Sequence, residues 1–302
     1  MARYSEAWLI GPRSTNFYTR TYAAASSIAS IVFIHGAAEH AGRYTDFHSS
    51  LAENGVTVFV YDQRGFGRTA LDAEHKSKDS AYGRTCRTLQ LEDLEWAVQH
   101  VRTQFNELPL FLMGFSMGGS LAFSFVSRDS PPSAKAATSL VSGIIGCAPT
   151  IHLTKPPSTI VRSVGRLVAL VAPNMLVPVK NKTQDLSRNV QTNKAYVEDP
   201  LVGMPGSFRS VGDLISGGAA LLDKDYQLWP PRLPLLILQG TADQVSDPAS
   251  TQAFFDKLPV EDKKLVIYPD ACHELHNEPV HKEVVSESVA FIKSHSSQIR
   301  SG

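Results

Sequence analysis

Six short runs of mostly apolar residues recur along the chain, and patterns typical of helices lie between them. Strands that are apolar on both sides are characteristic of a parallel sheet covered by helices on each face. The alternation therefore predicts an α/β fold with a mostly parallel central sheet flanked by helices. The runs are IVFIHG (31–36), TVFVYD (57–62), PLFLMG (109–114), TSLVSGII (138–145), LPLLILQG (233–240) and KKLVIYP (263–269).

Helices and an edge hairpin complete the expected core. EAWLIG and NFYTRTYA, on either side of the turn-forming residues 12–14, predict an antiparallel hairpin at the edge of the sheet. Helices are expected after Ser116 and over about 280–294. Another helix is predicted by apolar residues at spacings of three and four, namely Leu91, Leu94, Val98, Val101 and Phe105.

The interval between the fourth and fifth runs breaks this rhythm, because it is rich in proline and contains no clear strand. An insertion between strands, on the side where ligands bind, is most simply a helical cap. The expected organisation is an α/β core at 1–147, a cap at 148–225 and the rest of the core at 226–302. One amphipathic helix in the cap packs on its own core or presents a surface that meets lipid. Its apolar residues are Ile160, Val164, Leu167, Val168 and Val171.

Composition excludes several classes of protein. The chain has 302 residues, 43% of them hydrophobic and 19% charged, which is ordinary globular material. Lys plus Arg and Asp plus Glu both count 29, so no basic excess favours nucleic acid. Cys86, Cys147 and Cys272 form no CxxC pair, which argues against a disulfide framework or a zinc site. No signal peptide or membrane-spanning run is recognised, and a cytoplasmic location is expected.

A serine between two glycines stands directly after the third apolar run, in the sequence Gly114-Phe115-Ser116-Met117-Gly118. A serine at a sharp turn from strand to helix is strained, and its neighbours must lack a Cβ. The strain lifts the hydroxyl above the sheet, where the helix N-terminus stabilises negative charge. The pattern alone is common, but its strand and helix context predicts that Ser116 is a nucleophile.

A serine nucleophile needs a base, because its hydroxyl is weakly reactive near neutral pH. In proteins with a nucleophilic serine at such a strand-to-helix turn, called a nucleophile elbow, an acidic residue and then a histidine follow the serine along the chain. Asp243 and His273 fit this order, and each follows an expected strand at its carboxyl end. Asp243 would orient the imidazole and stabilise its charged form. The alternatives are a capping role for Asp243, for which Asp247 is the better candidate, and a solvated loop position for His273.

The tetrahedral intermediate of such a reaction carries an oxyanion, which needs hydrogen-bond donors. One expected donor is the backbone N–H of Met117, the residue after the nucleophile. The other should come from the loop after the first apolar run, where Ala37 is the predicted donor.

Several blocks of sequence occur in one order along the chain, and together they resemble the monoacylglycerol lipases of the α/β-hydrolase superfamily. The resemblance runs from about 28 to 295 and extends into the cap. The blocks are HGAAEHAGRY (35–44), GFSMGG (114–119), LSRN (186–189), AYVEDPL (195–201), LLILQGTADQVSD (235–247) and YPDACHELHNEP (268–279).

The resemblance implies hydrolysis of monoacylglycerols to glycerol and fatty acid through an acyl-enzyme, under a lid whose apolar helix meets membrane lipid. It also implies that Glu39, Arg43, Tyr196 and His276 hold the glycerol head, with Phe115 beside the substrate. A glycerol with two free hydroxyls needs a few placed polar groups in an apolar pocket. The alternatives are a surface ion pair for Glu39 and Arg43, and a solvated or more remote position for His276.

The chain departs from the family pattern at a few positions. Phe115 stands where histidine is frequent, and Thr69 stands where serine is usual. Gly203 stands near the place of a family cysteine. These changes leave the predicted triad intact, while an enzyme acting on another ester or a lactone would keep the same machinery.

The sequence thus predicts a serine hydrolase that needs no cofactor and no metal, acting on a small lipid ester. HELH (273–276) lacks the HExxH spacing of a zinc helix. A non-catalytic member that only binds a ligand is the alternative from another class. The cap predicts contact with membranes or lipid droplets, although its apolar residues could equally pair two subunits.

Overall fold

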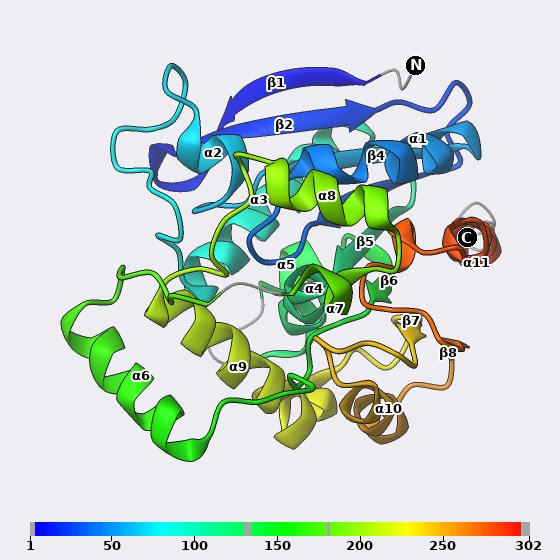
Figure 1. Cartoon of the computed structure of the whole chain (residues 1–302). Helices are drawn as coiled ribbons and strands as arrows, with labels where there is room; N and C mark the ends of the chain where they lie inside the picture. Colours follow the sequence, from blue (N-terminus) through cyan, green and yellow to red (C-terminus); the bar gives the residue numbers. More distant parts are fainter. Residues whose placement is uncertain (1–3, 130–133, 180–181, 297–302) are drawn as a thin grey trace.

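The computed structural model describes residues 4–129, 134–179 and 182–296, and it is built on one eight-stranded sheet (Figure 1). The strand order is β1-β2-β4-β3-β5-β6-β7-β8, in which β3 to β8 run parallel and the β1–β2 hairpin pairs antiparallel with β4. The predicted parallel sheet and edge hairpin are confirmed. The strands are β1 Ser5–Ile10, β2 Asn16–Tyr22, β3 Ala29–Ile34, β4 Val56–Tyr61, β5 Leu110–Phe115, β6 Val141–Cys147, β7 Leu235–Gly240 and β8 Lys263–Tyr268.

Strand β6 shows the largest difference from the expected boundaries. Its apolar run was expected to pair from residue 138, whereas pairing begins at Val141. The short helix α5 (Lys135–Thr138) occupies the start of the run, so those backbone groups bond within the helix.

Helices cover both faces of the sheet, and alternate residues of each strand face opposite layers. Ile31 and Phe33 of β3 pack in the cluster that contains α1 and α11, while Val32 and Ile34 pack with α3, α4 and α10. This two-sided burial explains why the strands are nearly continuous apolar runs. The core helices are α1 Thr45–Glu53, α2 Gly67–Leu71, α3 Arg87–Gln104, α4 Met117–Ser127, α10 Pro248–Lys257 and α11 His281–Ser296, and the short 3₁₀ turns are Pro12–Ser14, Ala41–Tyr44, Asp225–Leu228 and Leu275–Asn277.

The interval between β6 and β7 is helical. Its first residues are held to the core, since the backbone N–H of Thr154 donates to the carbonyl of Val245 at 3.0 Å. Its helix α6 packs against α9. The exact limits of the cap, 148 and 225, stay a prediction. The helices are α6 Thr159–Val171, α7 Thr183–Leu186, α8 Val190–Glu198 and α9 Phe208–Asp223.

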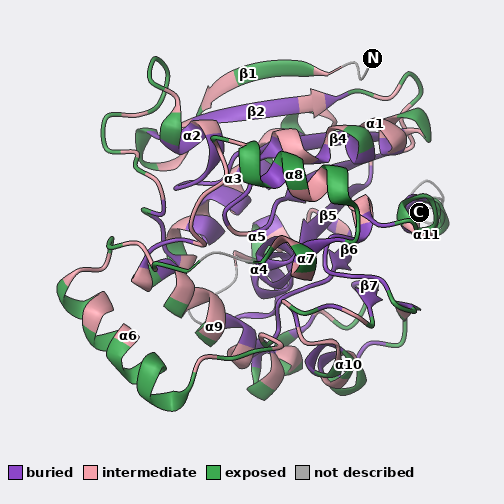
Figure 2. Ribbon diagram, viewed as in Figure 1, coloured by how far each residue is buried: buried purple, intermediate pink, exposed green. Residues whose placement is uncertain are grey.

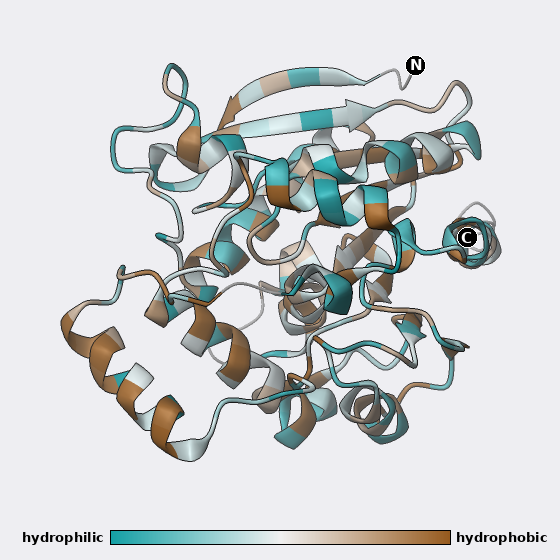
Figure 3. Cartoon of the chain, viewed as in Figure 1, coloured by the Kyte–Doolittle hydropathy of each residue, from teal (hydrophilic) through white to brown (hydrophobic). Residues whose placement is uncertain are grey.

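Helix α6 projects from the body of the molecule, and none of its residues is buried (Figures 1 and 2). Leu170 is 80% exposed and Ile160 is 77% exposed. Figure 3 shows strongly hydrophobic residues along this outlying helix. Of the two alternatives left by the sequence, packing of this face on the protein's own core is therefore not observed. Among the described residues, no helix is both long enough and apolar enough to cross a membrane.

Candidate active site

Ser116 lies at the turn between β5 and α4 with φ 56° and ψ −120°, a strained conformation for a residue with a side chain. The glycines on either side are required by close backbone packing. A Cβ on Gly114 would lie 2.2 Å from the carbonyl oxygen of Gly118, and a Cβ on Gly118 would lie 2.0 Å from that of Ile34. The elbow can therefore form only where both positions lack a side chain.

Three side chains from different strand ends meet at this turn. The Nε2 atom of His273 lies 2.9 Å from Oγ of Ser116, and its Nδ1 lies 2.8 Å from Oδ2 of Asp243. The carboxylate can only accept from Nδ1–H, so Nε2 is left to accept the serine proton. The three residues predicted from the sequence are thus in the geometry of a nucleophile, a base and a group that orients the base.

The carboxylate of Asp243 is almost fully buried and hydrogen-bonded. Its Oδ1 accepts the backbone N–H groups of Val245 and Ser246, both at 2.8 Å, and its Oδ2 also accepts the side-chain amide of Gln239 at 3.0 Å. These bonds replace water around the charge and fix the direction in which the carboxylate faces His273. The neighbouring Asp247 caps α10 by accepting from the backbone of Ala249 and Ser250, as expected.

The pKa of His273 is raised above its ordinary value of 6.5. Burial by itself lowers this pKa, but the charge of Asp243 and its hydrogen bond outweigh burial. An imidazole whose charged form is stabilised in this way takes the serine proton more readily.

The two predicted oxyanion donors come from segments that pack directly together. Met117 is the first residue of α4, where backbone N–H groups have no partner within the helix. Ala37 lies in the loop after β3, and the next residue, Ala38, has a positive φ of 64°. The approach of Gly118 to the carbonyl of Ile34 brings the first turn of α4 against the start of that loop.

The predicted head-group residues form a buried polar cluster beside this loop rather than a surface ion pair. The Nε atom of Arg43 lies 3.6 Å from a carboxylate oxygen of Glu39, and its guanidinium lies 4.6 Å from the ring centroid of Tyr196 in the cap. The hydroxyl of Tyr44 donates to Glu39 and accepts from the backbone of Gly36. Burial raises the pKa of Glu39 to about 7, although Arg43 acts in the opposite direction.

Aromatic contacts join this cluster to the triad. The Phe115 ring lies 4.7 Å from that of His273 and 4.9 Å from that of His276, centroid to centroid. His276 is half-buried, and desolvation of its ring holds its pKa well below the ordinary value. It is a neutral ring that lies beside Phe115.

The structure adds polar residues that sequence reasoning missed. Glu274 is fully buried and pairs with Nη2 of Arg43 at 2.7 Å. Thr150, at the start of the cap, places its hydroxyl 3.2 Å from Oγ of Ser116. Glu274 could have been suspected from the sequence, because it is a charged residue directly after His273, whereas no motif indicated Thr150. Among the described residues, no cluster of histidine, cysteine or acidic side chains is arranged to hold a metal ion.

Comparisons with known proteins find relatives that match most of this chain. A predicted monoglyceride lipase of Schizosaccharomyces pombe is 32% identical over 276 residues, covering 89% of this chain and 68% of that protein. A monoacylglycerol lipase of Mycolicibacterium smegmatis is 29% identical over 271 residues, covering 88% of both chains. The solved structure of a soluble variant of Saccharomyces cerevisiae monoglyceride lipase, bound to a substrate analogue, superimposes with a TM-score of 0.84 at 22% identity over 98% of this chain and 95% of that one.

The family profile described as serine aminopeptidase, S33 matches residues 25–280, which span both parts of the core and the interval between them. This match, together with the fold and the relatives above, shows that the chain belongs to that family of α/β-hydrolases.

Proposed function

We propose that this protein is a serine hydrolase that cleaves monoacylglycerols to glycerol and fatty acid. The observation that carries the proposal is the contact series from Ser116 through His273 to Asp243, on a chain whose relatives include monoglyceride lipases. For this enzyme we propose a core formed by residues 1–147 and 226–302 and a cap formed by residues 148–225.

The proposed reaction follows from the directions of the hydrogen bonds among Ser116, His273 and Asp243. His273 takes the proton of Ser116 as Oγ bonds to the ester carbonyl carbon, and the backbone N–H groups of Ala37 and Met117 bind the oxyanion. The imidazolium then protonates the departing glycerol oxygen and leaves an acyl group on Ser116. Water, deprotonated by His273, attacks this ester and releases the fatty acid.

The polar cluster supports glycerol as the alcohol. Glu39, Arg43 and His276 provide acceptors and donors within an otherwise aromatic wall that includes Tyr196 and Phe115. Such a wall with a few placed polar groups suits a small diol next to a long acyl chain.

The cap supports contact with a lipid surface. Interval 151–182 contains five basic residues and no acidic residue, and the exposed apolar face of α6 lies within it. An amphipathic helix with an apolar face and basic neighbours binds anionic lipid surfaces. The surface is formed by Ile160, Val161, Val164, Leu167, Leu170 and Val171.

The first experiment measures fatty acid release from monoacylglycerols of about 8 to 20 carbons, next to diacylglycerols, triacylglycerols and lactones. Wild type is compared with Ser116→Ala and with Ser124→Ala, in which the changed residue is a buried serine of α4 whose hydroxyl donates to the backbone carbonyl of Ser120. Fastest turnover of monoacylglycerols, lost in Ser116→Ala and kept in Ser124→Ala, supports the proposal.

Two other results would redirect it. Cleavage of another ester or a lactone, with monoacylglycerols untouched, would keep the nucleophile and reject the substrate. A folded wild type that fails to react with a fluorophosphonate at Ser116 would reject catalysis and favour a ligand-binding protein.

The lipid contact is tested by co-sedimentation with phosphatidylglycerol vesicles. Leu167→Ser combined with Leu170→Ser is expected to weaken binding about tenfold or more, because each removes exposed apolar surface. Ile10→Ser is the matched control, since Ile10 is 76% exposed on β1, away from α6 (Figure 1). Equal binding of both variants would show that α6 is not the contact.

A further inference from the structure

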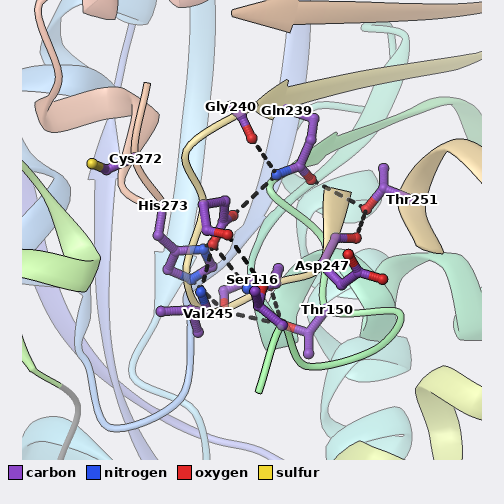
Figure 4. A network of polar contacts seen from close by, with 12 residues as sticks. Ser116, Thr150, Gln239, Gly240, Val245, Asp247, Thr251, Cys272 and His273 are labelled. Atoms are coloured by element: carbon purple, nitrogen blue, oxygen red, sulfur yellow. Dashed lines mark hydrogen bonds and ion pairs between the residues drawn. The ribbon is translucent and has the colours of Figure 1, made fainter. Parts of the chain in front are cut away.

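The hydroxyl of Thr150 touches the atom that reacts. Figure 4 shows Thr150 beside Ser116. The Oγ1 atom of Thr150 lies 3.2 Å from Oγ of Ser116 and 2.9 Å from Oγ of Ser246. Both Thr150 and Ser246 are buried, and the backbone N–H of Thr150 donates to the carbonyl of Ser116 at 3.1 Å. Because Ser246 also donates its N–H to Asp243, the polar contacts form a closed ring around the nucleophile.

The direction of each hydrogen bond in the ring follows from the triad. The only proton of Ser116 Oγ is donated to Nε2 of His273, as argued above. Oγ can therefore only accept in its contact with Thr150, which must donate. The hydroxyl of Thr150 is then free to accept from Ser246, whose own proton has this acceptor at 2.9 Å. Ser246 thus orients the proton of Thr150 toward the nucleophile.

We infer that Thr150 is a further catalytic residue, which assists the departure of Ser116 when the acyl-enzyme is hydrolysed, and that Ser246 is its positioning residue. The inference rests on the serine hydrolase chemistry of the proposed function, but not on the monoacylglycerol substrate. It assigns to the start of the cap a part in the chemical step.

The chemistry distinguishes the two halves of the reaction. In deacylation, the bond between the acyl carbon and Oγ breaks, its electron pair goes to Oγ, and the proton on Nε2 of His273 is transferred to Oγ. Oγ changes from an ester oxygen, which accepts weakly, toward an alkoxide, which accepts strongly. The bond from Thr150 therefore strengthens in the transition state, which is the condition for catalysis. Thr150 keeps its proton throughout.

In acylation the change runs the other way. Oγ begins as a hydroxyl oxygen that accepts well and ends as an ester oxygen that accepts weakly. The transition states for attack and departure of Oγ share the same partial alkoxide character, but in acylation the hydrogen bond is already strong in the starting hydroxyl, so it helps the first step less. Loss of the Thr150 hydroxyl should slow deacylation more than acylation, a selective effect that a merely structural role would not produce.

The test uses p-nitrophenyl butyrate and measures, by rapid quenching and mass spectrometry, the ratio of acylated to free Ser116 at steady state. Thr150→Val keeps the size of the side chain and removes the hydroxyl. Its deacylation rate is expected to fall about tenfold, with a smaller fall in the rate of the p-nitrophenol burst, so that the ratio of acylated to free Ser116 rises. Thr150→Ser should restore the wild-type ratio. Ser246→Ala should raise the ratio less than Thr150→Val.

Thermal melting of each variant separates a folding defect from a kinetic effect, and Ser124→Ala is the control for loss of a buried hydroxyl elsewhere. An unchanged ratio in Thr150→Val would overturn the inference, as would an equal slowing of acylation and deacylation that Thr150→Ser shares. A wild type that releases no p-nitrophenol from any ester would overturn both this inference and the proposed function.

Discussion

His48 is expected to make the protein sensitive to acid. It lies on α1, is fully buried, and its ring centroid lies 4.4 Å from that of Phe33 and 5.1 Å from that of Tyr22. Among the described residues, neither of its ring nitrogens has a hydrogen-bond partner. Burial, assisted by the charge of Arg20, lowers its pKa from 6.5 to about 3.

The sign and size of the effect follow from this shift. The unfolded chain binds a proton at His48 below pH 6.5, whereas the folded protein does not until about pH 3. Its contribution to the free energy of unfolding is therefore present above pH 6.5 and lost as the pH falls. Each unit of pH between these limits costs about 1.4 kcal/mol, which gives a loss of about 2 kcal/mol at pH 5.

The perturbation is His48→Phe, and the assay is urea unfolding at pH 8 and pH 5. The difference in unfolding free energy between the two pH values should be about 2 kcal/mol smaller in the variant than in wild type. The larger phenyl ring can strain the core, but this strain is the same at both pH values and cancels in the difference. Phe47→Leu, in the same cluster, is the control without a titratable group and should leave the difference unchanged. A wild-type difference retained in His48→Phe would refute the reasoning.

Three further predictions concern the helices, the base and the cap. In α9, Gly212→Ala should raise the free energy of unfolding by about 0.5–1 kcal/mol, because nothing lies within 4 Å of the new Cβ. Gly218→Ala should lower the free energy of unfolding, since its Cβ would lie 2.1 Å from the carbonyl oxygen of Ile151. Urea titration checks both, and a stabilised Gly218→Ala would contradict the packing. In Asp243→Asn, kcat for an ester should fall about 10³- to 10⁴-fold. In wild type, kcat/KM should fall as the pH drops through the raised pKa of His273, above pH 6.5, because the reaction needs the neutral base. In Asp243→Asn this fall should occur at lower pH. An unchanged pH profile would contradict the assigned cause of the raised pKa of His273. The carboxylate of Glu278 accepts hydrogen bonds from Cys272 N, Ser187 Oγ and Arg188 N. Glu278→Gln should therefore reduce the free energy of unfolding by about 1–3 kcal/mol. An unchanged urea midpoint would show that the amide satisfies the same donors.

The strands and the elbow could be predicted because their causes are local in the sequence. A strand buried on both faces must be apolar throughout, so β3 and β7 are visible as runs. The strained turn at Ser116 requires glycine at two positions, and this common pattern became informative because it stands between an apolar run and a helix. Asp243 and His273 could be located because the carboxyl ends of parallel strands meet at one edge.

The ring around Ser116 could not be predicted, because its members are distant in the chain. Thr150 is 34 residues from Ser116 and 96 residues from Ser246, and a single threonine or serine carries no motif. The burial of Glu274 depends likewise on Arg43, 231 residues away. Helix α6 shows a different limit of prediction from sequence. The spacing of its apolar residues predicted an apolar face, but only the packing of the cap shows that this face is exposed.

The absence of buried side chains in α6 separates two properties that most enzymes must adjust together. If α6 makes the proposed lipid contact, a substitution on its outer face would change attachment to an interface at no cost to the core, because no buried side chain is altered. Variants with graded interfacial affinity and a constant turnover number are therefore accessible by changing this one helix. Such a series would make the cap of this protein an independent control over where the hydrolase works.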